Sequence, residues 1–327
     1  MTLLGAARRL RGFIAAGLAV TAAAAHAGPD VDRIKADGVI RCGGVSRPGL
    51  VAPAPGGREA SGLYLDLCRA IGAALLGPEG RIEFRAYDFD AAFARVREGC
   101  DDLAFLDGSE ILDNGLAGRT ILGPAVVFVS TGAMVPADSP AKSLADLAGK
   151  SVCFYQGSAA HRTLEAFMTE RRLDFTRMPY TEHGEMDDAY RARKCDAEAG
   201  ETGDLAAARL PGDGASRILP EPLATFPVFA VTPASDPQWA AIVMWAIAAL
   251  ERAEAPRGPW TAGADAGAPR GADLGLPDDW RSRVLAAAGT YADIYARKLG
   301  ERSPLRLPRG PNAPAEAGGL LVAPHRE

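Results

Sequence analysis

Cysteine and histidine are the residue types in this 327-residue sequence that could form a metal or redox centre, and their spacing argues against one. The cysteines are Cys42, Cys68, Cys100, Cys153 and Cys195. None forms a C-x-x-C pair, and the histidines lack the paired spacing that is typical of zinc sites. We therefore expect no metal and no cofactor. In an oxidising compartment some cysteines should pair, but spacing does not assign the partners, and an odd number leaves at least one unpaired.

Ser158 and His161 could act as a nucleophile and its base, but no third residue that would orient the histidine accompanies them. We therefore expect no catalytic residue here. His183, Glu185, Asp187 and Asp188 form a second polar group, which we assign to a solvated helix start, where acidic residues favour the helix dipole.

The N-terminus has the pattern of an export signal. Arg8, Arg9 and Arg11 precede an apolar stretch at 12–25, and Ala25-His26-Ala27 is an A-x-A cleavage site. We predict cleavage after Ala27 and a periplasmic location; the alternative is an amphipathic first helix. Residues 1–27 contain three arginines and no acid, so the net charge changes from −5 to −8 on cleavage. An acidic mature chain makes a nucleic-acid partner unlikely.

The hydrophobic pattern predicts alternating helices and strands, hence an α/β fold with parallel strands. We predict helices at 30–36, 63–76, 90–98, 143–148, 159–171, 185–193, from 236 and at 278–299. We predict strands at 38–42, 81–87, 102–106, 151–155, 175–179 and 196–199, and extended runs at 124–136 and 220–231. Residues 255–276 are predicted to be a surface loop and the last 25 an extended tail.

The two extended runs bracket one α/β unit, which is thereby inserted into another. This arrangement predicts two lobes joined by a paired-strand hinge, with a ligand crevice between them. The first strand runs into Gly43-Gly44, and such a strand end is where an α/β sheet opens a crevice.

Six segments of the chain resemble the periplasmic general L-amino-acid-binding proteins, within solute-binding family 3 of ABC transporters. They are DRIKADGVIRCG at 32–43, GLYLDLCRA at 62–70, KCD at 194–196, QWAAIVMW at 238–245, SPLRLPRGPN at 303–312 and GGLLVAP at 318–324. The resemblance implies a two-lobed type II periplasmic binding fold that closes on a small polar, amino-acid-like ligand and docks to an inner-membrane ABC permease. We expect a monomer, with lobe 1 at 28–130 and 227–327 and lobe 2 at 131–226.

The resemblance also implies disulfide pairs. Cys153 is expected to pair with Cys195 in lobe 2, and Cys42 with Cys68 in lobe 1, which leaves Cys100 alone. Two buried thiols are the alternative for Cys42 and Cys68.

The resemblance places a ligand site in the crevice. Members of the family hold the α-carboxylate with an arginine and nearby donors on the first lobe, and the ammonium with an acid on the second. The positions implied here are Asp107, Gly108, Ser109, Gln156, Gly157, Ser158, Glu201 and Thr202. Glu201 takes the place of the ammonium-binding aspartate. The loop at 156–159 joins a strand end to a helix N-terminus, whose free N–H groups favour an anion.

The sequence departs from the family at the arginine that clamps the carboxylate. Asn114 occupies that position and cannot supply a bidentate cation. Arg47, after the first glycine turn, and Arg119 are candidate substitutes; the alternative for Arg119 is a solvent-facing loop residue. Tyr64, where the family more often has an acid, is interpreted as a core or a lip aromatic.

Three functions are compatible with this sequence. The favoured one is a transport receptor that is not an enzyme. The second is a dehydratase-type enzyme on the same fold, for which Glu201 is the candidate acid or base. The third is a non-transporting accessory or sensory binding protein, which is suggested by Asn114 at the position of the family's arginine.

Overall fold

The structure is a computed structural model that describes residues 28–52, 60–87, 91–108, 111, 118–209, 216–254 and 268–323. The predicted signal peptide, residues 1–27, lies outside the described residues. Within the described ranges, no helix combines the length and the apolar composition needed to cross a membrane.

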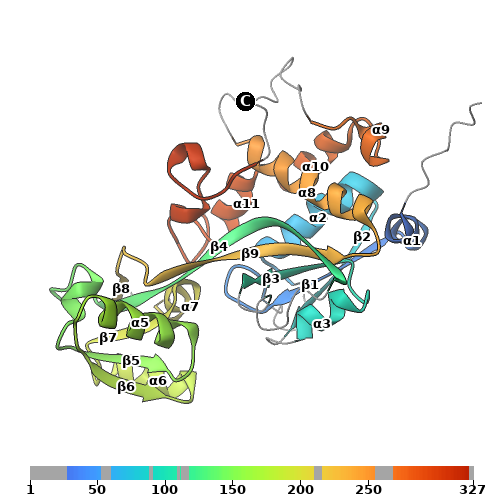
Figure 1. The fold of residues 1–327 in the computed structure, drawn as a ribbon. Coiled ribbons are helices and arrows are strands. Elements are labelled where there is room, and N and C mark those ends of the chain that lie inside the picture. Colours follow the sequence, from blue (N-terminus) through green and yellow to red (C-terminus); the bar gives the residue numbers. More distant parts are fainter. Residues whose placement is uncertain are drawn as a thin grey trace, which may run out of the picture.

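The described strands form one mixed sheet that runs through the whole molecule (Figure 1). They are β1 (Val39–Val45), β2 (Arg81–Tyr87), β3 (Leu103–Asp107), β4 (Thr120–Pro136), β5 (Ser151–Tyr155), β6 (Thr176–Tyr180), β7 (Ala197–Glu201), β8 (Ser216–Ile218) and β9 (Ala224–Pro233). The order is β2-β1-β3-β9-β4-β7-β5-β6, with β8 paired to β4. The predicted α/β class is confirmed.

Helices pack on this sheet and cover its edges. They are α1 (Pro29–Asp37), α2 (Leu63–Leu76), α3 (Ala91–Arg97), α5 (Ala159–Glu170), α6 (His183–Arg191), α7 (Thr202–Ala208), α8 (Pro237–Arg252), α9 (Gly271–Leu274), α10 (Trp280–Ala288) and α11 (Tyr291–Lys298), with 3-10 turns η2 (Leu144–Leu147), η4 (Gly310–Asn312) and η5 (Ala315–Ala317). The helix predicted at 143–148 is thus a single 3-10 turn, which ends before Gly149, a glycine with a φ of 72°.

Three parallel strands form the first lobe's part of the sheet, with β1 between β2 and β3. Helices α2 and α3 are the crossovers, as the alternation predicted. Tyr64, at the start of α2, is 2 % exposed and stacks on Phe105 with ring centroids 4.7 Å apart, so it is a core residue. β1 continues through Gly43 and Gly44 instead of ending there. Glycine at position 43 leaves room for the ring of Tyr87, since a Cβ there would lie 2.4 Å from that ring.

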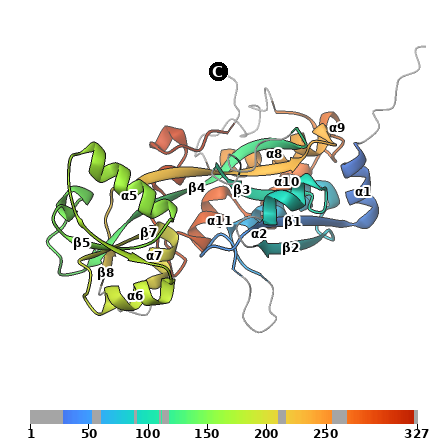
Figure 2. The same cartoon turned by 60° about the horizontal axis from the view of Figure 1, so that its bottom comes forward.

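The long antiparallel pair of β4 and β9 carries the chain between the lobes (Figures 1 and 2). The two strands pair from Thr120–Pro233 to Thr131–Ala224. From Thr131 onward β4 also pairs with β7 of the second lobe. The predicted paired-strand hinge is therefore confirmed.

The second lobe has an apolar core of its own. Strands β5, β6 and β7 are parallel, and α5 and η2 cover one face of them. Leu144, Phe154 and Leu164 lie in this core, which shares no buried residue with the core of the first lobe. Helix α7 and strand β8, which the sequence pattern did not predict, complete the lobe.

One buried carboxylate starts two helices of the first lobe. Asp236 is fully buried, and its Oδ1 accepts a hydrogen bond from the Trp239 backbone N–H at 3.1 Å, which caps α8. Its Oδ2 accepts from the backbone N–H groups of Asp30 at 3.0 Å and Val31 at 2.9 Å, which fixes α1. The carboxylate thus satisfies three N–H groups that helix ends otherwise leave unpaired.

Two expectations for the C-terminal part are wrong. The helix predicted at 278–299 is two helices, α10 and α11, because Gly289 has a φ of 81° and Thr290 and Asp293 form a capping box that starts a new helix. The surface loop predicted at 255–276 contains α9, although residues 255–267 lie outside the described residues.

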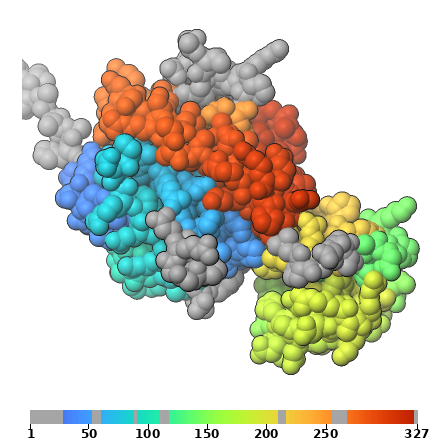
Figure 3. Space-filling model, turned by 180° about the vertical axis from the view of Figure 1, so that it is seen from behind, coloured from blue at the N-terminus to red at the C-terminus, as the bar shows by residue number. Residues whose placement is uncertain are grey.

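The C-terminal tail is pinned to the hinge. The Asn312 side chain accepts a hydrogen bond from the Phe128 backbone N–H at 2.7 Å and donates one to the Phe128 carbonyl oxygen at 2.9 Å. Arg309 pairs with Glu254, just after α8, at 3.1 Å. The tail is therefore not simply extended, since it forms η4 and η5. Figure 3 shows the orange and red C-terminal segments across one face of the first lobe.

Both disulfide pairs implied by the resemblance are present. Cys42 of β1 is joined to Cys68 of α2, and Cys153 of β5 to Cys195 before β7. Each bond lies within one lobe and links a strand to a neighbouring element. Cys100, which is half-buried, is the one cysteine of the described part that forms no disulfide.

The contact between the tail and the hinge leads to a stability prediction. Asn312→Ala should lower the free energy of unfolding by about 2 kcal/mol, because it leaves the Phe128 N–H and C=O without partners. Urea denaturation with the disulfides intact measures the change. Glu316→Ala, at an exposed position of the same tail, is the control. Equal loss in both variants would contradict the role of Asn312.

Candidate functional site

A cleft of about 990 Å³ lies between the two lobes, at the ends of β1, β3, β5 and β7. The first lobe contributes Ser46, Arg47 and Asp107, and the hinge strands contribute Val129 and Phe226. The second-lobe lining residues are Tyr155, Gln156, Gly157, Ser158, Ala159, Ala160, Arg162, Thr163, His183, Met186, Asp187, Glu198, Ala199, Gly200, Glu201, Asp204, Leu205, Ala207 and Ala208. The cleft is thus the crevice that the sequence predicts.

Arg47 makes ion pairs with both lobes. Its Nη2 lies 2.6 Å from Oδ2 of Asp107, at the end of β3, and its Nε lies 3.5 Å from Oε2 of Glu201, at the end of β7. The Arg47 backbone is held by hydrogen bonds with Val51, which fold residues 47–51 into a tight loop after β1. Arg47 is therefore fixed on the first lobe and reaches the second.

The charges of this group are coupled. Burial disfavours the charged form of Arg47, but Glu201, Tyr64 and Asp107 outweigh this effect and raise its pKa above the ordinary value. Burial raises the pKa of Glu201, and the nearby Arg47 charge offsets part of the increase. The Arg47 side chain is 11 % exposed and that of Glu201 28 %, so both charges lie largely out of water.

Polar groups of the loop at 156–158 form hydrogen bonds with the first turn of α5. Ser158 Oγ accepts a hydrogen bond from the His161 backbone N–H at 3.0 Å, and His161 Nδ1 accepts one from the Gly157 N–H at 3.1 Å. The histidine ring therefore faces the loop backbone and does not bond the serine hydroxyl. Ala159 and Ala160, the first two residues of α5, line the cleft with N–H groups that have no intrahelical acceptor.

The remaining predicted site residues are distributed over three places. Asp107 lies in the cleft, with Gly108 directly after it. Thr202, at the start of α7, lines a second cavity of about 350 Å³ between the hinge, β8 and the tail. Ser109 and Asn114 lie outside the described residues. Arg119 is exposed, at the start of β4, and is not among the residues that line the cleft.

Comparison with known proteins gives matches over nearly the whole chain. No family model matches. The chain is 28% identical over 329 residues to the general L-amino acid-binding periplasmic protein AapJ of Rhizobium johnstonii, which covers 95% of this chain and 96% of AapJ. It is 26% identical to the glutamate/glutamine/aspartate/asparagine-binding protein BztA of Rhodobacter capsulatus, over 95% of this chain and 97% of BztA.

A solved structure matches equally widely. A periplasmic binding protein of an ABC transporter from Brucella ovis, with glutathione bound, has a TM-score of 0.72 at 25% identity and covers 91% of this chain and 99% of its own. The predicted resemblance to periplasmic amino-acid-binding proteins is confirmed. The type II periplasmic binding fold is confirmed with it.

Three acidic residues of the cleft were not predicted as part of the site. Asp187 is half-buried and faces the cleft, while Glu185 and Asp188 are exposed, so the expected solvated group at 183–188 is only partly correct. Burial raises the pKa of Asp187 and that of Asp204. Glu198, in the middle of β7, is 2 % exposed, and burial raises its pKa to about 7.

A signal for Glu198 exists in the sequence. A glutamate flanked by alanines in a predicted strand places a charged group in an apolar setting, and such a group needs a partner. Asp187 carries no such signal, because it lies on a helix rich in polar residues, and Asp204 carries none, because the pattern did not predict α7. Tyr155 stacks on His183 with ring centroids 4.3 Å apart and also lines the cleft.

The raised pKa of Glu198 predicts a pH dependence of stability. The folded state holds a proton on this carboxyl up to about pH 7, whereas the unfolded state loses it near 4.5, so stability should fall as pH rises between these values. Glu198→Gln should reduce this loss of unfolding free energy between the two pH values by up to about 3 kcal/mol. Urea denaturation at a series of pH values measures it. Glu182→Gln, an exposed position before α6, is the control, and equal flattening in both variants would contradict the assignment.

Proposed function

We propose that the protein is the periplasmic solute-binding receptor of an ABC importer and that it binds an amino acid or a similar small polar solute. The observation that carries this proposal is the Arg47 contact, in which a first-lobe cation meets a second-lobe acid inside the cleft. A zwitterion has a carboxylate that can pair with Arg47 and an ammonium that can pair with Glu201. The relatives named above are periplasmic binding proteins for amino acids, which supports the same function.

In this proposal Arg47 takes the role of the missing carboxylate clamp. A ligand carboxylate would replace Glu201 as the partner of the Arg47 Nε, and the ligand ammonium would pair with the released Glu201. The N–H groups of Ala159 and Ala160 and the amide of Gln156 would complete the anion side. Asp107 keeps Arg47 in place through the 2.6 Å ion pair. Ser109 and Asn114 remain part of the proposed site on the resemblance.

Lobe closure would occur about the hinge strands. The proposed boundaries, 130/131 and 226/227, fall within β4 and β9, whose pairing joins Phe128 to Pro227 and Ser130 to Thr225. Two paired strands can twist by small changes spread over several residues. The proposed lobes are 28–130 with 227–327, and 131–226.

Export and docking complete the proposal. Residues 1–27 would be removed after Ala27, and the mature chain would act in the periplasm as a monomer. The closed pair of lobes would present one continuous surface to an inner-membrane permease. The periplasmic location of the relatives supports this placement.

We also propose that the protein is not an enzyme. Glu201, the candidate acid or base of the dehydratase alternative, is held in an ion pair with the guanidinium of Arg47, which offsets part of the pKa increase caused by burial. Ser158 caps α5 and bonds no histidine side chain. Both arrangements suit ligand binding better than proton transfer.

Calorimetric titration with arginine, glutamine, glutamate and alanine tests the receptor function and the role of Arg47. Arg47→Gln should weaken binding of the preferred amino acid by at least about 100-fold, because a buried charge-assisted pair is lost. Arg119→Gln, the other candidate arginine, should change binding less than about twofold, since Arg119 is exposed outside the cleft.

Two results would overturn these assignments. Failure of all four amino acids to bind or to raise the Tm would overturn the receptor function for amino acids. Strong loss in Arg119→Gln with little loss in Arg47→Gln would move the clamp to Arg119.

A further inference from the structure

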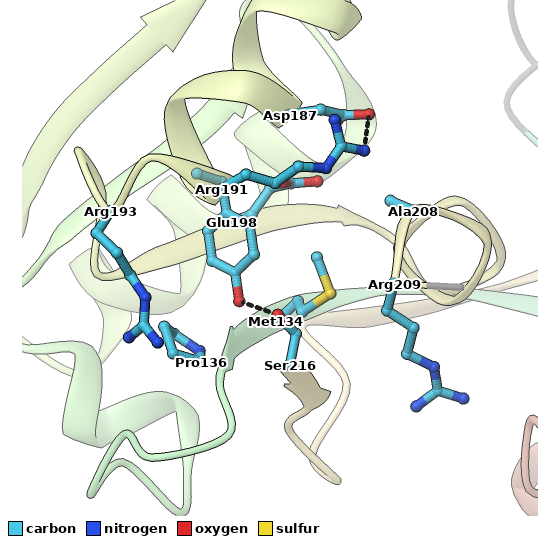
Figure 4. A pocket seen from close by; sticks show the side chains of 10 residues that line it. Met134, Pro136, Asp187, Arg191, Arg193, Glu198, Ala208, Arg209 and Ser216 are labelled. Carbon is cyan, nitrogen blue, oxygen red and sulfur yellow. Dashed lines mark hydrogen bonds and ion pairs between the residues drawn. The ribbon is translucent and has the colours of Figure 1, made fainter. Parts of the chain in front are cut away.

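A recess of about 250 Å³ opens into the second lobe between α6 and α7 (Figure 4). Its lining residues are Met134, Pro136, Asp187, Tyr190, Arg191, Arg193, Glu198, Ala208, Arg209 and Ser216. Asp187, Glu198 and Ala208 also line the cleft. The recess therefore adjoins the ligand cleft at these three residues.

Glu198 lacks a partner inside this recess. The residue is 2 % exposed, and its Oε2 is buried with no hydrogen-bond partner. Its neighbours on the strand, Ala197 and Ala199, face the apolar core of the lobe, so Glu198 faces α6 and α7 instead. A buried carboxylate without a partner is costly, and a native site retains one when something else satisfies it.

The arginines around the recess are engaged with other groups. Arg191 lies 3.6 Å from Asp187, as the dashed line in Figure 4 shows, and 3.1 Å from Asp188. Arg193 pairs with Asp138 at 2.9 Å. Arg209 donates to the Leu305 carbonyl oxygen at 2.6 Å. None of these bonds reaches Glu198, although the charge of Arg191 offsets part of the increase in the Glu198 pKa that burial causes.

The lining of the cleft is acidic as a whole. Among the described residues, five carboxyl side chains line it, and they are Asp107, Asp187, Glu198, Glu201 and Asp204. Two arginines oppose them, and Arg47 is already shared between Asp107 and Glu201. The other, Arg162, donates to the Gly157 carbonyl oxygen at 2.6 Å. Arg191, beside the cleft, pairs with Asp187, but the acidic side chains of the lining still outnumber the arginines, which favours a ligand with more than one positive charge.

We propose that the recess is a second cation-binding subsite, in which Glu198, with Asp187 and Asp204 beside it, receives a positively charged arm of the ligand. This inference rests on the proposed receptor function. The ligand class is a small solute with a second ammonium or a guanidinium group, such as a diamino acid, a guanidino amino acid or a diamine. The first ammonium pairs with Glu201, and the arm passes Glu201 into the second lobe.

Glu198→Gln tests the subsite because it keeps the shape of the side chain and removes its charge. At pH 8 this variant should bind arginine and ornithine at least about 10-fold more weakly than the unaltered protein, and glutamine within about twofold. Isothermal titration calorimetry measures all three. The matched control is Glu251→Gln, which alters another buried glutamate with an unpartnered oxygen, in α8 of the first lobe and outside the cleft. It should leave all three affinities within about twofold.

The unaltered protein offers a second test that needs no variant. A cation binds the ionised carboxyl, so the affinity for ornithine should rise between pH 6 and pH 8, and binding should release protons. Calorimetry in two buffers of different ionisation enthalpy counts these protons. The titratable and charged groups that face Glu198 from α6, α7 and the segment after α6 are Asp187, Tyr190, Arg191, Arg193, Asp204 and Arg209. If the Glu198→Gln variant releases no protons when it binds ornithine, the protons released by the unaltered protein come from Glu198.

The outcomes separate the subsite from the receptor function. If glutamine binds and ornithine and arginine bind no better, or if Glu198→Gln weakens all probes equally, the subsite is wrong and the receptor function stands. Proton uptake on binding ornithine would also overturn the subsite, because it would mean that neutral Glu198 donates to the ligand. If arginine, ornithine, putrescine and glutamine all fail to bind, the receptor function itself fails for these solutes.

Discussion

The antiparallel pairing of β4 with β9 is the constraint on which the rest of the molecule depends. These two strands run through one sheet that serves both lobes, and their ladder extends from Thr120 to Thr131 on β4. Each lobe has an apolar core and a disulfide of its own, although Ala206 of α7 belongs to the core of the first lobe. The relative position of the lobes then depends on the hinge strands, on this apolar contact of α7 and on a few polar contacts.

Two of the polar contacts join the second lobe to the first. Arg47 pairs with Glu201, and Arg209, directly after α7, donates to the Leu305 carbonyl oxygen of the tail. Asn312 fastens the same tail to Phe128 of β4. The tail therefore supports the hinge, although none of its described residues lines the cleft. A rotation of the second lobe must change both contacts at once.

Hydrophobic patterning and β-rich runs that lack helical periodicity predicted the positions of most strands along the chain and the hinge, but not the order of the strands in the sheet. Arg47 was a candidate because it follows the first glycine turn, and Glu201 because the resemblance places it at the position of the ammonium-binding aspartate. The sequence did not predict the break between α10 and α11, where Gly289 and the Thr290 cap override a continuous helical pattern. Nor did it predict the contributions of Asp187 and Asp204, since burial of one face of a polar helix depends on packing between elements distant in the chain.

In the proposed receptor, the electrostatics of the cleft would determine which ligands bind. In this structure Arg47 is paired with Glu201, so a ligand carboxylate that takes the place of Glu201 should be accompanied by an ammonium that pairs with Glu201. A solute without an ammonium would leave Glu201 without its partner, whereas Arg47 would keep its ion pair with Asp107. Selectivity for zwitterions then arises from the cost of breaking an existing pair, and a further positive charge is favoured wherever an acid, such as Glu198, has no pair to break.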